Sequence, residues 1–165
     1  MLVSPKLRKT PPNGRNSSGF KKQKIDGPFV AITLEMLESP AWQALGITER
    51  RVLDRIELEH LSHGGTQNGK LIVTYDNFVR YGVSRKGISK ALHVLEELGF
   101  LEVTVWGRGA NGEARRASKY RLTAATGNLE PTNEWRQIKT KIEAKTRAKH
   151  AVQRSVIKGS SYRRI

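Results

Sequence analysis

The chain has 165 residues, 37% hydrophobic and 27% charged, so it can bury one modest core and carry tails. It has no cysteine, which excludes disulfides and thiolate metal sites, and no apolar run of about 18 residues that would predict a membrane span. Its formal net charge of +15 favours polyanionic partners.

The positive charge is concentrated at the two ends. Residues 1–30 contain seven lysines and arginines against one acidic residue, and residues 131–165 contain ten against two. Residues 31–130 are nearly balanced, with thirteen basic and twelve acidic side chains. Basic ends on a nearly neutral domain are typical of arms that bind polyanions, and they add affinity with little sequence selectivity.

Residues 1–28 are predicted to form a disordered basic arm, because they combine prolines, Asn-Gly and Ser-Gly pairs and lysines with little apolar material. The arm is interpreted either as a solubilising tail or as an electrostatic arm that binds DNA. The first residues contain no apolar core of a signal peptide, so the expected location is cytoplasmic and associated with the nucleoid.

Three helix starts follow the apolar segment 29–32. Thr33 is predicted to cap a first helix, and Ser39 a second one in which Pro40 occupies the first position. Gly46 is expected to end that helix, and Thr48 to cap a third. The outward charges of the third helix have both signs, which indicates a supporting helix.

Two patterns in this region resemble ligand sites and are rejected. The glycines and lysine of residues 64–70 have the spacing of a phosphate-binding loop, but Leu71 replaces the Ser or Thr, and the loop opens a strand. Glu57, His60 and His63 supply only one Glu-x-x-His pair, which is too few ligands for a di-metal site. They are interpreted as surface residues at a helix end, and no metal or cofactor is expected.

A helix-turn-helix pattern occupies residues 73–106. Thr74 and Ser84 are predicted N-caps, and Val73 and Val83 stand before them as hydrophobic staple residues. In order, the pattern predicts a helix at 74–81, a tight turn at 82–83, a helix at 84–98, a stop at Gly99 and a strand at 100–106.

The second of these helices has two distinct faces. Apolar residues at steps of three and four predict a buried stripe of Ile88, Ala91, Leu92, Leu95 and Leu98. The polar face is basic in its N-terminal half and carries Arg85, Lys86, Ser89, Lys90 and His93, whereas Glu96 and Glu97 come at the far end. This distribution suits a helix that enters a major groove N-terminus first.

The segment after this helix alternates as a β-hairpin does. Leu101, Val103 and Val105 are predicted to face the core, and Tyr120 and Leu122 to do the same on the returning strand. The glycine-rich loop at 107–119 is interpreted as a wing that reaches phosphates or a minor groove, or as a solvated loop. Its basic residues are Arg108, Arg115, Arg116 and Lys119.

The C-terminal part is predicted as a linker at 124–132, a basic helix at 133–157 and a frayed tail at 158–165. The helix is expected to pack on the domain through Trp135 and Ile138, to pair with a second copy, or to lie on DNA. Its apolar positions form a thin stripe of Trp135, Ile138, Ile142, Ala148, Val152 and Val156.

Residues 29–123 resemble the winged helix-turn-helix proteins of bacteria, phages and plasmids, which are described as regulators or as replication-initiator-like proteins. The resemblance implies that the chain binds DNA. It is carried by Ser-Pro-Ala-Trp-Gln-Ala-Leu (39–45), Thr-Glu-Arg-Arg-Val-Leu (48–53), Tyr-Gly-Val-Ser-Arg-Lys-Gly-Ile-Ser-Lys-Ala-Leu (81–92) and Leu-Glu-Glu-Leu-Gly-Phe-Leu-Glu-Val (95–103).

The sequence therefore predicts a mainly α-helical winged helix-turn-helix domain with a small β-wing, which binds double-stranded DNA and is not an enzyme. The leading hypothesis is a sequence-specific transcriptional regulator, with a mobile element as one candidate source. The alternatives are a replication-initiation or conjugation accessory protein, and an architectural protein that binds nucleic acid non-specifically. A homodimer is a further hypothesis, and no small-molecule ligand is evident. The expected DNA-binding residues are Thr74, Ser84, Arg85, Lys86, Ser89, Lys90, His93, Arg108, Arg115, Arg116 and Lys119.

Overall fold

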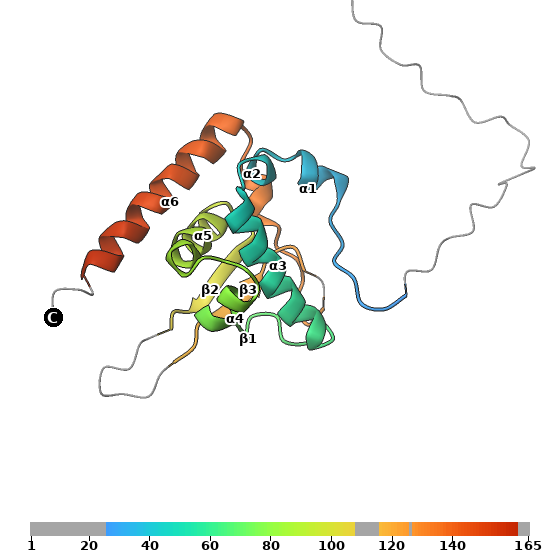
Figure 1. The fold of residues 1–165 in the computed structure, drawn as a ribbon. Coiled ribbons are helices and arrows are strands. Elements are labelled where there is room, and N and C mark those ends of the chain that lie inside the picture. Colours follow the sequence, from blue (N-terminus) through green and yellow to red (C-terminus); the bar gives the residue numbers. More distant parts are fainter. Residues whose placement is uncertain (1–25, 108–115, 126, 162–165) are drawn as a thin grey trace, which may run out of the picture.

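The computed structural model describes residues 26–107, 116–125 and 127–161, with side chains as far as residue 155 (Figure 1). The predicted N-terminal arm up to residue 25, the wing loop at 108–115 and residues 162–165 of the predicted tail lie outside the described residues.

The described part of the chain is mainly helical. Its α-helices and its single 3₁₀ turn, η1, are α1 (Leu34–Glu38), α2 (Pro40–Gln43), α3 (Ile47–Ser62), α4 (Tyr75–Arg80), α5 (Arg85–Glu97), η1 (Glu134–Gln137) and α6 (Lys141–Ser161). Three short strands, β1 (Leu71–Ile72), β2 (Leu101–Val105) and β3 (Lys119–Leu122), form an antiparallel sheet in the order β1-β3-β2. The register pairs Leu71 with Tyr120 and Leu101 with Leu122.

Side-chain caps define three of the helix starts as predicted. Thr33 accepts a hydrogen bond from the Met36 N–H, Ser39 accepts one from the Trp42 N–H, and Thr74 forms a reciprocal capping box with Asn77. The prediction for α3 is wrong, because its N-cap is Gly46 and the helix already begins at Ile47, which is 78% exposed.

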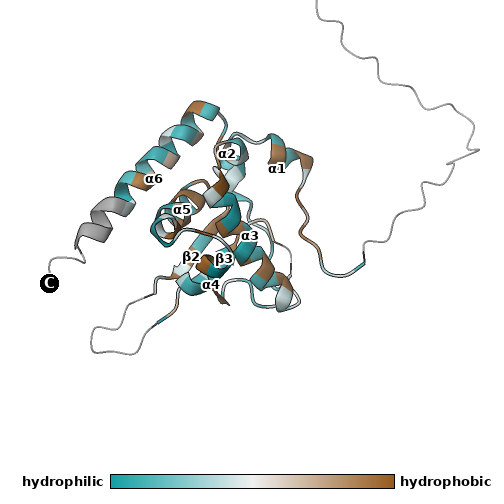
Figure 2. Ribbon diagram, viewed as in Figure 1, coloured by the Kyte–Doolittle hydropathy of each residue, from teal (hydrophilic) through white to brown (hydrophobic). Residues whose placement is uncertain are grey.

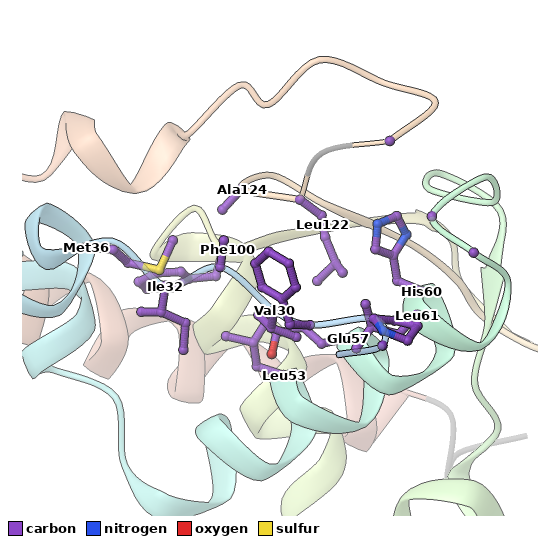
Figure 3. Close-up of a pocket in the computed structure, with 18 residues that line it drawn as sticks. Val30, Ile32, Met36, Leu53, Glu57, His60, Leu61, Phe100, Leu122 and Ala124 are labelled. Atoms are coloured by element: carbon purple, nitrogen blue, oxygen red, sulfur yellow. The ribbon is translucent and has the colours of Figure 1, made fainter. Parts of the chain in front are cut away.

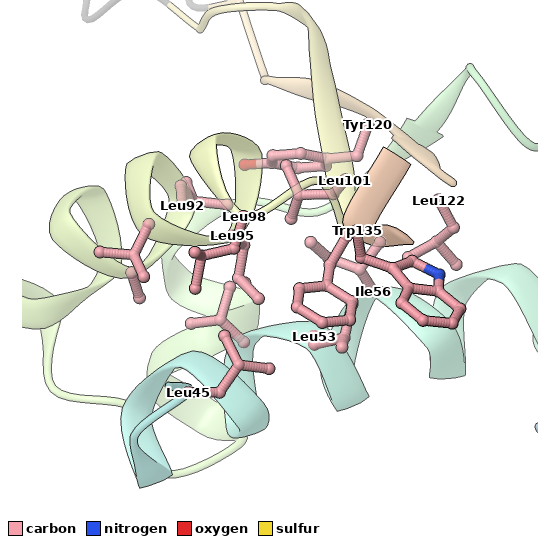
Figure 4. Packing of buried hydrophobic residues seen from close by; sticks show 14 of the residues in the cluster. Leu45, Leu53, Ile56, Leu92, Leu95, Leu98, Leu101, Tyr120, Leu122 and Trp135 are labelled. Atoms are coloured by element: carbon pink, nitrogen blue, oxygen red, sulfur yellow. The ribbon is translucent and has the colours of Figure 1, made fainter. Parts of the chain in front are cut away.

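The core lies where α5 meets α3, α4 and the sheet (Figure 4). The predicted stripe of α5 is confirmed, since Ile88, Ala91, Leu92, Leu95 and Leu98 are all fully buried. The alternation in the two long strands is also confirmed, with Leu101, Val103, Tyr120 and Leu122 buried. Burial of one face of α5 leaves its opposite face as the one that can meet a partner.

The 3₁₀ turn and α6 replace the single helix predicted at 133–157. The chain is extended at Ile138, and the Thr140 hydroxyl accepts a hydrogen bond from the Glu143 N–H in a new first turn. This break changes the phase of the helix, so that Ile142 is 80% exposed and the buried positions are Ala144, Ala151 and Ser155. Of the three alternatives given for this segment, packing on the domain through Trp135 and Ile138 is confirmed, because they are 2% and 3% exposed.

A buried asparagine holds the loop before β1 against the end of β3. The Asn68 side-chain amide donates to the Leu122 carbonyl at 2.9 Å, and its side-chain oxygen accepts from the Leu122 N–H at 2.8 Å. The Asn128 side chain makes two further hydrogen bonds with the backbone of Asn68. Asn68 thus substitutes for a strand partner at this position.

We expect Asn68→Ala to lower the free energy of unfolding by about 2–4 kcal/mol, because it leaves a buried N–H and a buried carbonyl of Leu122 unpaired. Urea unfolding followed by circular dichroism measures the loss. The matched control is Asn77→Ala, which removes the exposed capping partner of Thr74 and should lower the free energy by about 1 kcal/mol. Equal losses in the two variants would contradict this role for Asn68.

Candidate nucleic-acid interface

The exposed face of α5 carries three cations on its first two turns. Lys86 and Lys90 are exposed, and Arg85 keeps 62% of its side chain exposed while it forms an ion pair with the equally exposed Asp76 of α4. Lys86 and Lys90 are one turn apart and therefore share one side of the helix. Arg85 is held toward α4 by its ion pair, so the two lysines are the charges that α5 presents outward.

Ser89 is half-buried beside these cations and connects α5 to α4. The Tyr75 hydroxyl shares a hydrogen bond with the Ser89 side chain, and burial raises the pKa of that hydroxyl above its usual value. The tyrosine therefore stays neutral at physiological pH and fixes α4 against the first turns of α5. Ser89 retains only part of its surface for a ligand.

The two predicted N-cap residues, Thr74 and Ser84, differ in whether their hydroxyl groups are used in capping. The Thr74 hydroxyl is engaged with Asn77 in the capping box of α4. Ser84 occupies the N-cap position of α5, but its hydroxyl makes no capping hydrogen bond, and its side chain is exposed. The hydroxyl of Ser84 is therefore not used by the cap, and it lies at the start of α5 close in sequence to the exposed Lys86.

His93 is positioned by the hairpin. Its ring lies 4.6 Å from the ring of Trp106, with an angle of 31° between the two planes, and its side chain is 12% exposed. Its Nδ1 is 3.9 Å from a carboxylate oxygen of Glu96. The predicted DNA-contacting role therefore has little surface to act through, and the geometry assigns His93 to fixing the end of β2 against α5.

The hairpin places one predicted residue outward and another partly inward. Arg116 is exposed, whereas Lys119 is half-buried on β3, opposite Ile72 and Val105. Arg108 and Arg115 lie outside the described residues. Of the four basic residues predicted for this loop, Arg116 and Lys119 therefore lie in the described residues, and Arg116 is the exposed one.

α6 packs against α5 and forms the flank that the sequence reasoning missed (Figure 1). Arg154 of α6 pairs with Glu97, and Arg147 lies seven residues earlier, which places it on the same side of α6. Figure 2 colours the part of α6 that is not grey as mainly hydrophilic. The Arg154 pair offsets one carboxylate at the acidic end of α5, and the other, Glu96, accepts a hydrogen bond from the Val103 N–H.

Glu97 and Arg154 are 57 residues apart in the sequence, so no local pattern indicates that α6 lies beside α5. Helix periodicity finds the face of α6 that is apolar, but it does not identify the helix that covers that face. The small residues Ala144, Ala148 and Ala151 at steps of three and four were the available signal for close helix packing.

The sequence interpretation of Glu57 and His60 as surface residues is wrong. His60 is 6% exposed, and Glu57 is half-buried beside it in the wall of a cavity. This cavity lies under the segment 27–32, and none of the described residues that line it belongs to α5. His63, the third member of that pattern, is exposed and lies 3.3 Å from the Glu59 carboxylate.

No family model, curated protein or solved structure matches this chain. In the part of the chain that the structure describes, no helix is long and apolar enough to cross a membrane.

Proposed function

We propose that the chain binds double-stranded DNA through a winged helix-turn-helix in which α5 is the recognition helix. The observation that carries the proposal is the exposed pair Lys86 and Lys90 on the open face of α5, opposite its fully buried stripe. α4 and the turn at 81–84 precede this helix, and the β2–β3 hairpin follows it. This is the arrangement in which a helix presents its N-terminal half to a major groove.

In this proposal the contacts divide into two kinds. Lys86 and Lys90 pair with guanine acceptors or with phosphates at the groove edge, and Ser84 lies at the helix start where a phosphate would approach. Arg116 of the β2–β3 hairpin is exposed, and α6 packs beside α5 with Arg154 paired to Glu97 and Arg147 paired to Glu143. In this proposal these arginines contact the phosphate backbones. The biological role that we propose is transcriptional regulation in the cytoplasm.

The test is selection of bound duplexes from a random pool by the full-length chain at about 150 mM salt, where exposed charges are substantially screened. Enrichment of a defined sequence supports the proposal. A pool that stays random, with affinity falling steeply as salt rises, would mean that the basic ends bind DNA without reading it. That outcome would replace the regulator with an architectural protein.

The ion pair between Arg85 and Asp76 gives a second test, in which a substitution should strengthen DNA binding. We expect Asp76→Asn to raise DNA affinity about threefold to tenfold, because it removes a negative charge at the interface and releases Arg85 to bind phosphate. Fluorescence anisotropy with the selected duplex measures the change. In the Arg85→Ala background the gain from releasing Arg85 should disappear. Weaker binding by the Asp76→Asn single variant would contradict the placement of α4 beside DNA.

A further inference from the structure

A cavity of about 490 Å³ lies between the segment 27–32 and the C-terminal half of α3 (Figure 3). Its floor consists of side chains that belong to the core, with Leu53, Phe100 and Leu122 each no more than 3% exposed. Small-molecule sites in proteins usually measure about 300–1,000 Å³ and are lined mainly by apolar groups. The cavity therefore has the size and the lining of a ligand site.

The segment 27–32, here called the N-terminal strap, forms the outer wall. It has no helix or strand, and Figure 2 shows it as a hydrophobic stretch of chain. Phe29 is 56% exposed, Val30 39% and Ile32 42%, although all three line the cavity. The strap thus offers apolar side chains that are only partly covered, and a bound apolar molecule would bury more of their surface.

Glu57 places one carboxyl group in this apolar wall. Burial, and to a smaller extent the neighbouring charge of Asp54, raise the pKa of Glu57 to about 7. The described residues that line the cavity include no lysine or arginine. The other titratable groups near it are Asp54 and His60, both on α3, and the strap and the segment 122–127 contribute none to the described lining.

We propose that this cavity binds a small organic cation, with an apolar body against Leu53 and Phe100 and an ammonium group against the Glu57 carboxylate. The ammonium supplies the counter-charge that the described lining lacks, and a charge-assisted hydrogen bond in such surroundings is stronger than one in water. An anionic ligand would meet like charge at Glu57. A bare metal ion would leave most of the cavity empty and would find one carboxylate, where such ions require several oxygen ligands.

The proposal fixes how binding depends on pH. The carboxylate must be ionised to hold an ammonium by a charge-assisted hydrogen bond. A group with a pKa of about 7 is roughly one-tenth ionised at pH 6 and nine-tenths ionised at pH 8. Affinity for the cation should therefore rise about tenfold between these two pH values.

The test compares 4-phenylbutylamine with 4-phenylbutanol, which share an apolar body and differ in the charged group. Both are titrated into the full-length chain without DNA, and amide shifts in NMR spectra report the site and the affinity. We expect the amine to bind at least tenfold more tightly at pH 8, with shifts at Val30, Leu53 and Phe100. In Glu57→Gln, which keeps the shape of the side chain, this preference and its pH dependence should disappear.

Equal affinity for the amine and the alcohol in the wild-type chain would overturn the proposal, as would shifts confined to exposed acids such as Asp76. Asp76→Asn serves as the control variant, since it removes an exposed carboxylate outside the cavity and should leave the preference for the amine unchanged. All of these readouts are made in the absence of DNA. The result is therefore independent of whether α5 reads a DNA sequence.

Discussion

The double variant Lys86→Ala/Lys90→Ala should bind the selected duplex about 100-fold more weakly than the wild-type chain. Each good contact from a lysine or arginine to a base edge contributes about 1–3 kcal/mol, so two contacts of about 1.4 kcal/mol each account for a factor of about 100. Both side chains are exposed on the open face of α5, so their removal should leave the fold intact. Fluorescence anisotropy at constant salt measures the affinity.

The matched control is Lys70→Ala/Lys139→Ala. It removes two exposed lysines that belong neither to α5 nor to the β2–β3 hairpin, and so it lowers the net charge by the same amount. If both double variants lose affinity equally, net charge alone explains the binding. If the control variant binds DNA almost as tightly as the wild-type chain, the loss in Lys86→Ala/Lys90→Ala comes from contacts that α5 makes with DNA.

Selection from the random pool gives a further distinction. If Lys86 and Lys90 contact bases, the double variant should enrich a different or less defined sequence than the wild type. If they contact only phosphates, the same sequence should be enriched with lower affinity and a shallower dependence on salt. An unchanged sequence with unchanged affinity would show that α5 is not the recognition helix.

Local sequence patterns predicted those parts of the fold that depend on neighbours within about one helical turn. The stripe of α5 and the caps at Thr33, Ser39 and Thr74 are confirmed, because helical periodicity and capping need residues only three or four positions apart. The strands β2 and β3 followed from alternation for the same reason. These elements position Lys86 and Lys90, so this part of the candidate interface could be predicted.

Contacts between distant segments decided the features that sequence reasoning missed. The helix predicted at 133–157 is interrupted after η1, whose backbone lies close to Gly99, and periodicity contains no information about that contact. His93 has the spacing of a surface residue, yet Trp106 of the hairpin covers its ring. Glu57 and His60 became cavity residues because the N-terminal strap lies over this part of α3. None of these partners lies within one helical turn in the sequence.

Gly99→Ala should be the most destabilising single substitution of those considered, with a loss of about 3–5 kcal/mol in the free energy of unfolding. Gly99 ends α5 with a φ of +76°, which disfavours any residue with a side chain. A Cβ atom there would lie 2.6 Å from the Trp135 nitrogen and 2.7 Å from the Glu134 carbonyl carbon. These are backbone atoms of η1, so rotation of a side chain cannot relieve the contact.

Gly64→Ala separates the two causes of this loss, which are the positive φ and the steric overlap with η1. Gly64 also has a positive φ, +59°, but a Cβ atom there would meet nothing within 4 Å. It should therefore lose only the conformational part, about 1–2 kcal/mol. Urea unfolding of both variants gives the difference, which measures how tightly η1 is held at the end of α5.

The close approach of η1 to Gly99 connects the stability of the fold to the proposed DNA interface. Displacement of η1 would pull Trp135 out of the core and release the start of α6, whose packing beside α5 carries Arg154 to Glu97. We therefore expect faster amide exchange along α6 in Gly99→Ala, under conditions where most of the protein is still folded. If α6 stays as protected as in Gly64→Ala, its packing against α5 is independent of η1. If Gly99→Ala is also no less stable than that control, the close approach of η1 to α5 does not exist in solution.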